Sequence, residues 1–292
     1  MHFDSILALS DFSPPSAHAL ERAALLAEQH QLTLRLIHLD EGPNTVPVDP
    51  VARLGQRARQ LARRHEIDVH AIERSASLDA VLAEAGASSL LVMGPLSQRS
   101  WKRFHRGTTL DQAVHGSVCP LLVVRQEPLK PYERVLVAVD LSTRSRSLID
   151  FAGRFAAPHV LKLFHAIDTI EDSKLRSVNT SADAIQAHRL GSRQHARDRL
   201  AQLIGALGTA HAVSQASPLA FEVGNGDPAY STALHQLSTQ AELVVVGKRP
   251  TSALAQFFTG SVAQRLAKWA AGDVLIAPFN QTSVATAANI AR

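Results

Sequence analysis

The sequence predicts an α/β protein made of two tandem domains, each with a five-stranded parallel sheet. Apolar strand-like segments alternate with helix-like segments along the chain, which is typical of parallel sheets covered by helices. A second observation is a pattern that occurs twice: one apolar strand ends in aspartate, and a later apolar strand ends in glycine, with Gly-Thr or Gly-Ser further on. The spacing between the two glycines is the same in both copies, which indicates a duplicated unit.

The first copy alternates five predicted strands with four predicted helices. Ser13 followed by Pro14 is a typical helix start, because serine caps free amides and proline has no amide to leave unpaired. Right-handed crossovers between the strands would place helices on both faces of the sheet. We expect strands at residues 6–10, 32–39, 69–72, 90–94 and 121–124, and helices at residues 16–30, 51–65, 78–87 and 108–115.

The second copy repeats this order but is longer between its first and fourth strands. The additional residues lie mostly in segment 168–207, which we expect to form a helical and partly mobile arm. Pro128 and Pro131 favour an extended connector at residues 126–132, which predicts domains at 1–127 and 132–279 and a polar tail at 280–292. Strands of the second copy are expected at residues 135–139, 160–165, 219–223, 243–247 and 274–277.

Composition excludes several classes of protein. The chain of 292 residues is 46% hydrophobic and 19% charged, and it has no apolar run of the roughly 18 residues that a membrane span needs. Its beginning lacks the features of a secretory signal, so we expect a cytoplasmic protein. Cys119 is the single cysteine and is expected to pack within a strand, and the 14 histidines lack zinc-type spacing, so no metal site is predicted. The formal charge of +4 is too small to indicate nucleic-acid binding.

The repeated strand ends predict a crevice in each copy. In a doubly wound sheet, neighbouring first and fourth strands leave a crevice at their carboxyl ends, where Asp11 and Gly94 would lie. The aspartate would accept hydrogen bonds from a ribose or a base, glycine would let the backbone approach a ligand, and the next helix start would bind phosphate. His38-Leu39 and His165-Ala166 would present backbone groups to an adenine. The alternative is that aspartate forms the turn and Gly-Thr or Gly-Ser only caps the helix.

The ordered series of motifs resembles the universal stress protein family over essentially the whole chain. Residues 6–13 (Ile-Leu-Ala-Leu-Ser-Asp-Phe-Ser) and 135–142 (Val-Leu-Val-Ala-Val-Asp-Leu-Ser) look like the opening strand and turn of that family. Residues 91–94, 244–247, 119–124 and 226–228 match its later motifs. The resemblance implies Rossmann-like, adenine nucleotide α-hydrolase-like domains that pair through their last strands, here residues 121–124 beside 274–277, as a pseudo-dimer within one chain.

The same resemblance implies ATP or AMP as ligand in one or both crevices. The ATP-binding branch of the family has Gly-x2-Gly-x9-Gly-Ser/Thr after the fourth strand, and both copies depart from it, with Ser97 and Pro250 at the middle glycine. Proline has no amide donor, so the second loop loses one contact to phosphate. The positions that otherwise match are Asp140, Ala166, Gly247, Gly260, Ser261 and Val262 in the second copy, and Asp11, Leu39, Gly94, Gly107 and Thr108 in the first.

Three functions remain open from the sequence. The first is a stress-response binding and signalling module that takes up an adenine nucleotide. The second is a weak ATPase or nucleotidyl enzyme in the same crevice, with Lys248, Arg249 or the basic loop 99–106 steadying phosphate charge. The third is a nucleotide-free scaffold that holds a partner or another copy of the protein, including a further homodimer. No nucleophile with an adjacent base is evident, so no catalytic residue is predicted.

Overall fold

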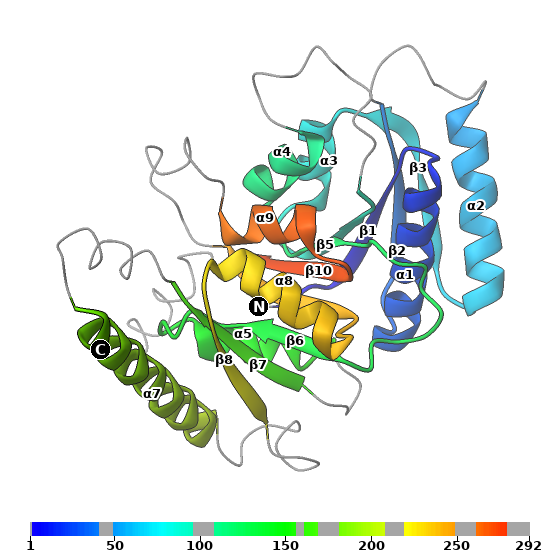
Figure 1. The fold of residues 1–292 in the computed structure, drawn as a ribbon. Coiled ribbons are helices and arrows are strands. Elements are labelled where there is room, and N and C mark those ends of the chain that lie inside the picture. The colour runs from blue at the N-terminus through cyan, green and yellow to red at the C-terminus, as the bar shows by residue number, and fades with distance from the viewer. Residues whose placement is uncertain are drawn as a thin grey trace, which may run out of the picture.

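The computed structural model describes residues 2–40, 49–95, 108–155, 161–168, 181–207, 219–248 and 261–278 (Figure 1). The first half contains β1 (Ser5–Ser10), α1 (Pro14–His30), β2 (Leu34–Leu39), α2 (Pro50–His65), β3 (Val69–Ala76), α3 (Leu78–Ala85), β4 (Ser89–Met93), α4 (Thr109–Gly116) and β5 (Leu121–Val123). The second half contains β6 (Val135–Ala138), α5 (Ser145–Ala152), β7 (Leu161–Ile167), α7 (Ala182–Leu207), β8 (Ala220–Asn225), α8 (Pro228–Thr239), β9 (Leu243–Lys248), α9 (Val262–Trp269) and β10 (Asp273–Pro278).

The described strands form one sheet of ten strands in the order β3-β2-β1-β4-β5-β10-β9-β6-β7-β8. Every neighbouring pair is parallel except β5 and β10, which are antiparallel, with Leu122 opposite Leu275. The predicted pairing of the two last strands is therefore confirmed. It joins the two predicted five-stranded sheets into a single ten-stranded sheet, because each half would otherwise leave an unpaired strand edge at this position.

Helices cover both faces of this sheet, as the alternation of segments predicted (Figure 1). Side chains alternate between the faces along each strand, so Ile6 and Ala8 belong to one core and Leu7 and Leu9 to the other. The first core is closed by α1, α2, α5 and α7, and the second by α3, α4, α8 and α9. Cys119 is buried in the second core, which confirms its predicted packing role.

Most predicted strands and helices agree with the structure to within about two residues, and β3 differs more. Strand β3 runs to Ala76 and not to residue 72, because a register shift between Leu36 and His38 lets β2 and β3 keep pairing beyond it. The described part of the predicted arm is α7, a helix of 26 residues. Its C-terminal half contributes Ala196 and Leu200 to the core beside β7 and β8, while Leu190 nearer its start is exposed.

The connector between the halves is fixed by a buried acid in β10. Asp273 is 1% exposed and accepts hydrogen bonds from the backbone amides of Arg125 and Gln126, at 2.7 and 3.1 Å. Its other oxygen accepts from the Tyr132 hydroxyl at 2.6 Å and lies 3.5 Å from Nε of buried Arg22. Burial raises the pKa of Asp273, and these four donors oppose that rise. The first and last residues of the connector are thus held on the last strand of the second half.

Candidate functional site

The turn after the first strand of each half has the same geometry. Phe12 and Leu141 both adopt left-handed backbone conformations, with φ of 59° and 56°. The preceding aspartate stabilises each turn, since Oδ1 of Asp11 accepts from the amide of Ser13 and Oδ1 of Asp140 accepts from the amide of Ser142, both at 3.0 Å. The turn-forming role considered for these aspartates is therefore observed in both halves.

The register of the strands brings each aspartate to the same end of the sheet as its partner glycine. Ala8 of β1 is opposite Val92 of β4, so Asp11 and Gly94 both follow the carboxyl ends of neighbouring strands. In the second half Ala138 is opposite Val246, which places Asp140 and Gly247 in the same way. Asp140 is exposed, while Asp11 is only partly exposed. Both halves thus have the predicted arrangement of strand ends.

Gly94 serves the packing of α1. A Cβ atom at this residue would lie 2.7 Å from the carbonyl oxygen of Pro15 and 3.1 Å from the amide nitrogen of Ser16. The first turn of α1 therefore lies directly against the end of β4, at a distance that only glycine allows. The sequence pattern had suggested that this glycine admits a ligand, and the structure gives it a helix as neighbour.

The helix starts after the fourth strands carry capping boxes of different charge. Thr108 and Asp111 cap α4 reciprocally: the amide of Thr108 donates to the Asp111 carboxylate at 2.9 Å, and the amide of Asp111 donates to the Thr108 hydroxyl at 3.1 Å. Ser261 and Gln264 do the same for α9, at 2.8 and 3.2 Å. Burial acts to raise the pKa of Asp111, but hydrogen bonds from Lys268 and Thr108 hold it below its ordinary value. The first helix start therefore carries an ionised acid, and the second carries a neutral amide.

The strand-end histidines are engaged within the protein. Nδ1 of His38 hydrogen-bonds the hydroxyl of Ser75 at 2.7 Å, and the imidazole stacks on Phe12 with ring centroids 4.9 Å apart. Burial lowers the pKa of His38, against the opposing effect of the Asp40 and Asp11 carboxylates. Nδ1 of His165 donates to the carbonyl of Val139 at 2.8 Å. Both residues are satisfied by packing and hydrogen bonds, as the sequence interpretation favoured.

Lys248 does not reach toward a phosphate position within its own half. Its Nζ donates to the backbone carbonyls of His115 and Ser117, at the end of α4 in the first half, the latter at 3.0 Å. Burial lowers the pKa of this amine. On the same side of the molecule, Lys268 of α9 pairs with Asp111 of α4 at 2.7 Å. The lysine considered for an enzyme in the crevice therefore stabilises the contact between the halves.

The structure describes nine of the eleven predicted site residues. The first-half residues Asp11, Leu39, Gly94 and Thr108, and the second-half residues Asp140, Ala166, Gly247, Ser261 and Val262, all lie at carboxyl ends of strands or at the helix starts that follow them. Ala166 is partly exposed, whereas Leu39 is buried. Gly107, Gly260, Ser97, Pro250, Arg249 and the basic loop 99–106 fall outside the described residues. Within the described part of the chain, no group of acidic, histidine or cysteine side chains is arranged to hold a metal ion.

Sequence reasoning missed one repeated feature near these turns. Arg53 of α2 places its guanidinium carbon 4.6 Å from the centroid of the Phe12 ring, and Arg199 of α7 donates to the carbonyl of Leu141 at 3.0 Å. Each half therefore has, at its left-handed turn residue, an arginine from a helix that follows its second strand. The two helices differ in length and sequence, so comparison of the repeats gave no signal for this correspondence.

The fold defines a class of duplicated α/β proteins in which two halves share one sheet and each presents the same strand ends. The chain belongs to the universal stress protein family, since the family model matches residues 2–125 and 131–278. No match was found among curated proteins. No helix in the described ranges is both long and apolar enough to cross a membrane.

Solved structures show the same fold at low identity. A universal stress protein from Archaeoglobus fulgidus is 15% identical, with a TM-score of 0.65 over 95% of this chain and 99% of that one. A protein of unknown function from Pseudomonas aeruginosa is 20% identical, with a TM-score of 0.63 over 99% and 97% of the two chains. A putative universal stress protein from Pseudomonas aeruginosa is 18% identical, with a TM-score of 0.61 over 94% and 93%. These similarities support the fold.

Proposed function

We propose that this protein is a cytoplasmic stress-response binding and signalling protein that takes up an adenine nucleotide, ATP or AMP, in the crevice of its second half. The observation that carries the proposal is the position of Asp140, Gly247 and the start of α9 at one end of the sheet. A carboxylate there suits a ribose hydroxyl, and the first-turn amides of a helix suit a phosphate.

Three differences between the halves favour the second crevice. Its helix start has Gln264 where the first half has ionised Asp111, and a negative charge there opposes an anion. Asp140 is more exposed than Asp11, and Ala166 is more exposed than Leu39. One difference opposes it: Pro250 removes an amide donor from the second loop, so phosphate binding there relies mainly on the start of α9.

The experiment exchanges the residues that distinguish the two helix starts. Gln264→Asp keeps a side chain that can close the capping box but adds a charge near the proposed phosphate. At about 6 Å and an effective dielectric constant of about 20 to 40, the added repulsion is about 1.4 to 2.8 kcal/mol, which is roughly a tenfold to hundredfold loss of affinity. Asp111→Gln is the matched variant in the other half; it removes the ion pair with Lys268, but Lys268 lies in the last turn of α9, away from the proposed phosphate position, so ATP binding to the second crevice should be unchanged.

Calorimetry on protein stripped of copurified nucleotide measures these affinities, and circular dichroism verifies that each variant folds. Absence of heat with both ATP and AMP would reject the proposal. Equal effects of the two substitutions would also contradict it, because the ligand would then not distinguish the halves. Phosphate release that is lost in Asp140→Asn would instead support the enzyme, whereas release that survives this change would indicate a contaminant.

A scaffold that binds a second copy of the chain is the other candidate, and one observation favours it. Tyr230, Leu234 and Leu237 form an exposed apolar stripe on α8, spaced so that they share one helix face. Trp269 of the adjoining α9 is also exposed. If this stripe joins two copies, light scattering should show a dimer that Leu234→Glu converts to monomer. A monomeric parent protein at micromolar concentration would exclude this candidate.

A further inference from the structure

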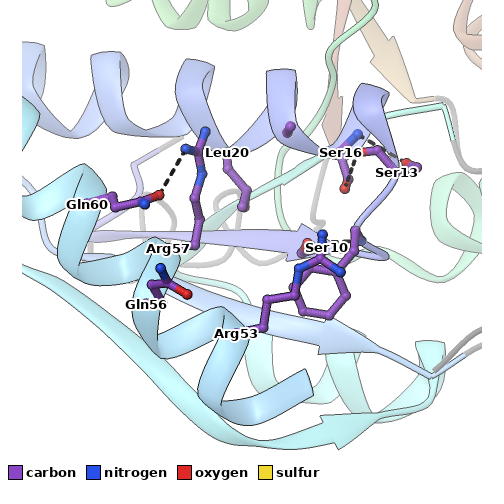
Figure 2. Close-up of a pocket in the computed structure, with 10 residues that line it drawn as sticks. Ser10, Ser13, Ser16, Leu20, Arg53, Gln56, Arg57 and Gln60 are labelled. Carbon is purple, nitrogen blue, oxygen red and sulfur yellow. Dashed lines mark hydrogen bonds between the residues drawn. The ribbon is translucent and has the colours of Figure 1, made fainter. Parts of the chain in front are cut away.

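A cavity of about 250 Å³ lies between α1 and α2, and it is separate from the proposed nucleotide site (Figure 2). Its walls come from the end of β1, the turn at Phe12, and the facing sides of the two helices. None of the first-half positions matched to the nucleotide pattern, Asp11, Leu39, Gly94 and Thr108, lines it. The cavity is also in the half whose crevice is the less favourable one for phosphate.

The space between the two helices stays open because their facing sides carry polar and small side chains and do not pack as an apolar core. Helix α2 buries Leu54, Ala58 and Leu61 against the sheet, and the neighbouring stripe of the same helix is polar. Across from it α1 presents small side chains near its start, so the two helices do not fill the space between them. The polar stripe that lines the cavity consists of Arg53, Gln56, Arg57 and Gln60, and the facing residues of α1 include Ser13, Ser16, Ala17 and Leu20.

Polar side chains with available donor groups line the cavity. Arg53 is an exposed residue whose guanidinium lies on the Phe12 ring, and this side chain forms no hydrogen bond or ion pair with any residue in the described ranges. Gln56 is also exposed, and its side-chain amide forms no hydrogen bond with any residue that the structure describes. Ser10 is 1% exposed and accepts from the amide of Phe12 at 3.2 Å, and its own proton meets no acceptor within the described part of the chain.

The charge balance of the cavity is positive. Arg57 is the second guanidinium at the cavity, and it is paired with Glu21 at 3.1 Å. Arg53 therefore supplies a positive charge that no carboxylate lining the cavity offsets, because no acidic side chain lines it. A guanidinium beside an amide and a hydroxyl that have no acceptor among the described residues is an arrangement that suits a carboxylate or phosphate.

In the second half, the arginine at the corresponding turn already has an acceptor for its side chain. Arg199 donates to the carbonyl of Leu141, which corresponds in the repeat to Phe12. In the first half an aromatic ring lies under the guanidinium of Arg53, so the N–H groups at its edge remain for another acceptor. The available donors are therefore particular to the cavity in the first half.

We propose that this cavity binds a small organic anion, with its carboxylate or phosphate held by Arg53, Gln56 and Ser10. The apolar body of the ligand packs against Ala17 and Leu20, which complete the wall. The volume lies just below the range of about 300 to 1,000 Å³ that is usual for drug-sized ligands, so a single ring or a short chain fits and a nucleotide does not. The proposal does not depend on nucleotide binding in the second half.

Titration with benzoate, phenyl phosphate and neutral benzamide tests the proposal, and the shifts of backbone amide signals in NMR spectra measure the binding. We expect at least one of the two anions to shift signals of α1 and α2 with millimolar or better affinity, and benzamide to bind at least tenfold more weakly. Arg53→Gln should weaken anion binding at least tenfold. Arg63→Gln is the matched control, because Arg63 is an exposed arginine of the same helix outside the cavity.

The outcomes separate a built site from general attraction to a basic surface. Equal weakening by Arg53→Gln and Arg63→Gln would overturn the proposal, as would equal affinity for benzoate and benzamide. Failure of both anions to shift any signal at 10 mM, about the weakest binding that still counts as a site, would overturn it too. Gln56→Glu places a carboxylate in the cavity and should abolish binding of both anions, and retained binding in this variant would place the ligand elsewhere.

Discussion

Replacement of Asp273 should lower the free energy of unfolding more than replacement of any exposed acid in this chain. Asp273→Ala would leave three donors without this acceptor: the buried hydroxyl of Tyr132 and the backbone amides of the partly exposed Arg125 and the exposed Gln126. The stranded Tyr132 hydroxyl costs about 1–3 kcal/mol, the two amides cost less because water reaches them, and a buried charge that loses its partner costs about 3–5 kcal/mol. The side chain of Arg22 is 6% exposed and would become such a charge. These terms are not additive, but a loss of at least about 5 kcal/mol is expected, which is comparable to the whole stability of many domains.

Asp273→Asn gives a measurable form of the same perturbation. It keeps one oxygen for the two backbone amides and loses the ion pair, so we expect a loss of about 2–4 kcal/mol in the free energy of unfolding. Urea denaturation followed by tryptophan fluorescence measures it. Asp68→Ala, an exposed acid just before β3, is the matched control and should cost less than about 1 kcal/mol. Adding Arg22→Met should recover part of the loss. Strict additivity of the two substitutions would refute the reasoning, because it would show that the two charges do not interact.

Three further predictions concern single residues. Gly94→Ala should destabilise the protein by about 1–3 kcal/mol in urea denaturation, since the added Cβ would press on the backbone at Pro15. Gly191→Ala is the contrasting variant, because its Cβ would meet no atom within 4 Å, and it should stabilise α7 by about 0.5–1 kcal/mol. Burial acts to raise the pKa of Glu21, but hydrogen bonds and charges from basic side chains outweigh it and hold this pKa below 4.5. The ionised Glu21 therefore contributes to the stability of the fold above pH 4.5, and this contribution is lost as the pH falls through the lowered pKa of the folded state. Glu21→Gln should reduce this acid-induced loss of stability. Lys248→Met should lower stability by about 1–3 kcal/mol and leave any ATP hydrolysis unchanged, and a selective loss of hydrolysis would instead support the enzyme.

The sequence predicted the fold well because the signals for it are periodic and repeated. Alternating apolar segments identified the strands, and the resemblance to the universal stress protein family implied that the halves pair through their last strands, which the opposition of Leu122 and Leu275 confirms. The extension of β3 was missed because it follows from a register shift against β2, which is a contact between distant residues. Local composition carries no information about such a shift.

The side-chain roles at the strand ends were harder to predict. Lys248 follows a strand-end glycine, and its position in the chain suggested a phosphate, yet its long side chain reaches the other half. The direction of a flexible side chain depends on its neighbours in space. Asp273 carried a signal that comparison of the repeats could have found, because the first half has Pro120 at the corresponding start of its last strand. An acid at a position that is buried in the repeat requires partners, and here they are the connector and Arg22.

The duplicated sheet explains why these differences between the halves can persist. Pairing of β5 with β10 depends on backbone hydrogen bonds and on apolar residues that both halves supply. It therefore does not constrain the residues at the carboxyl ends of the other strands. Exchanges such as Asp111 for Gln264 leave both helices capped, since either side chain closes the box. The exchange changes the charge that an anion would meet there and the ion pair that Asp111 forms with Lys268 of the other half. A duplicated chain of this kind can therefore retain one crevice for a ligand while the other half keeps its fold and acquires a different surface, such as the cavity beside Arg53.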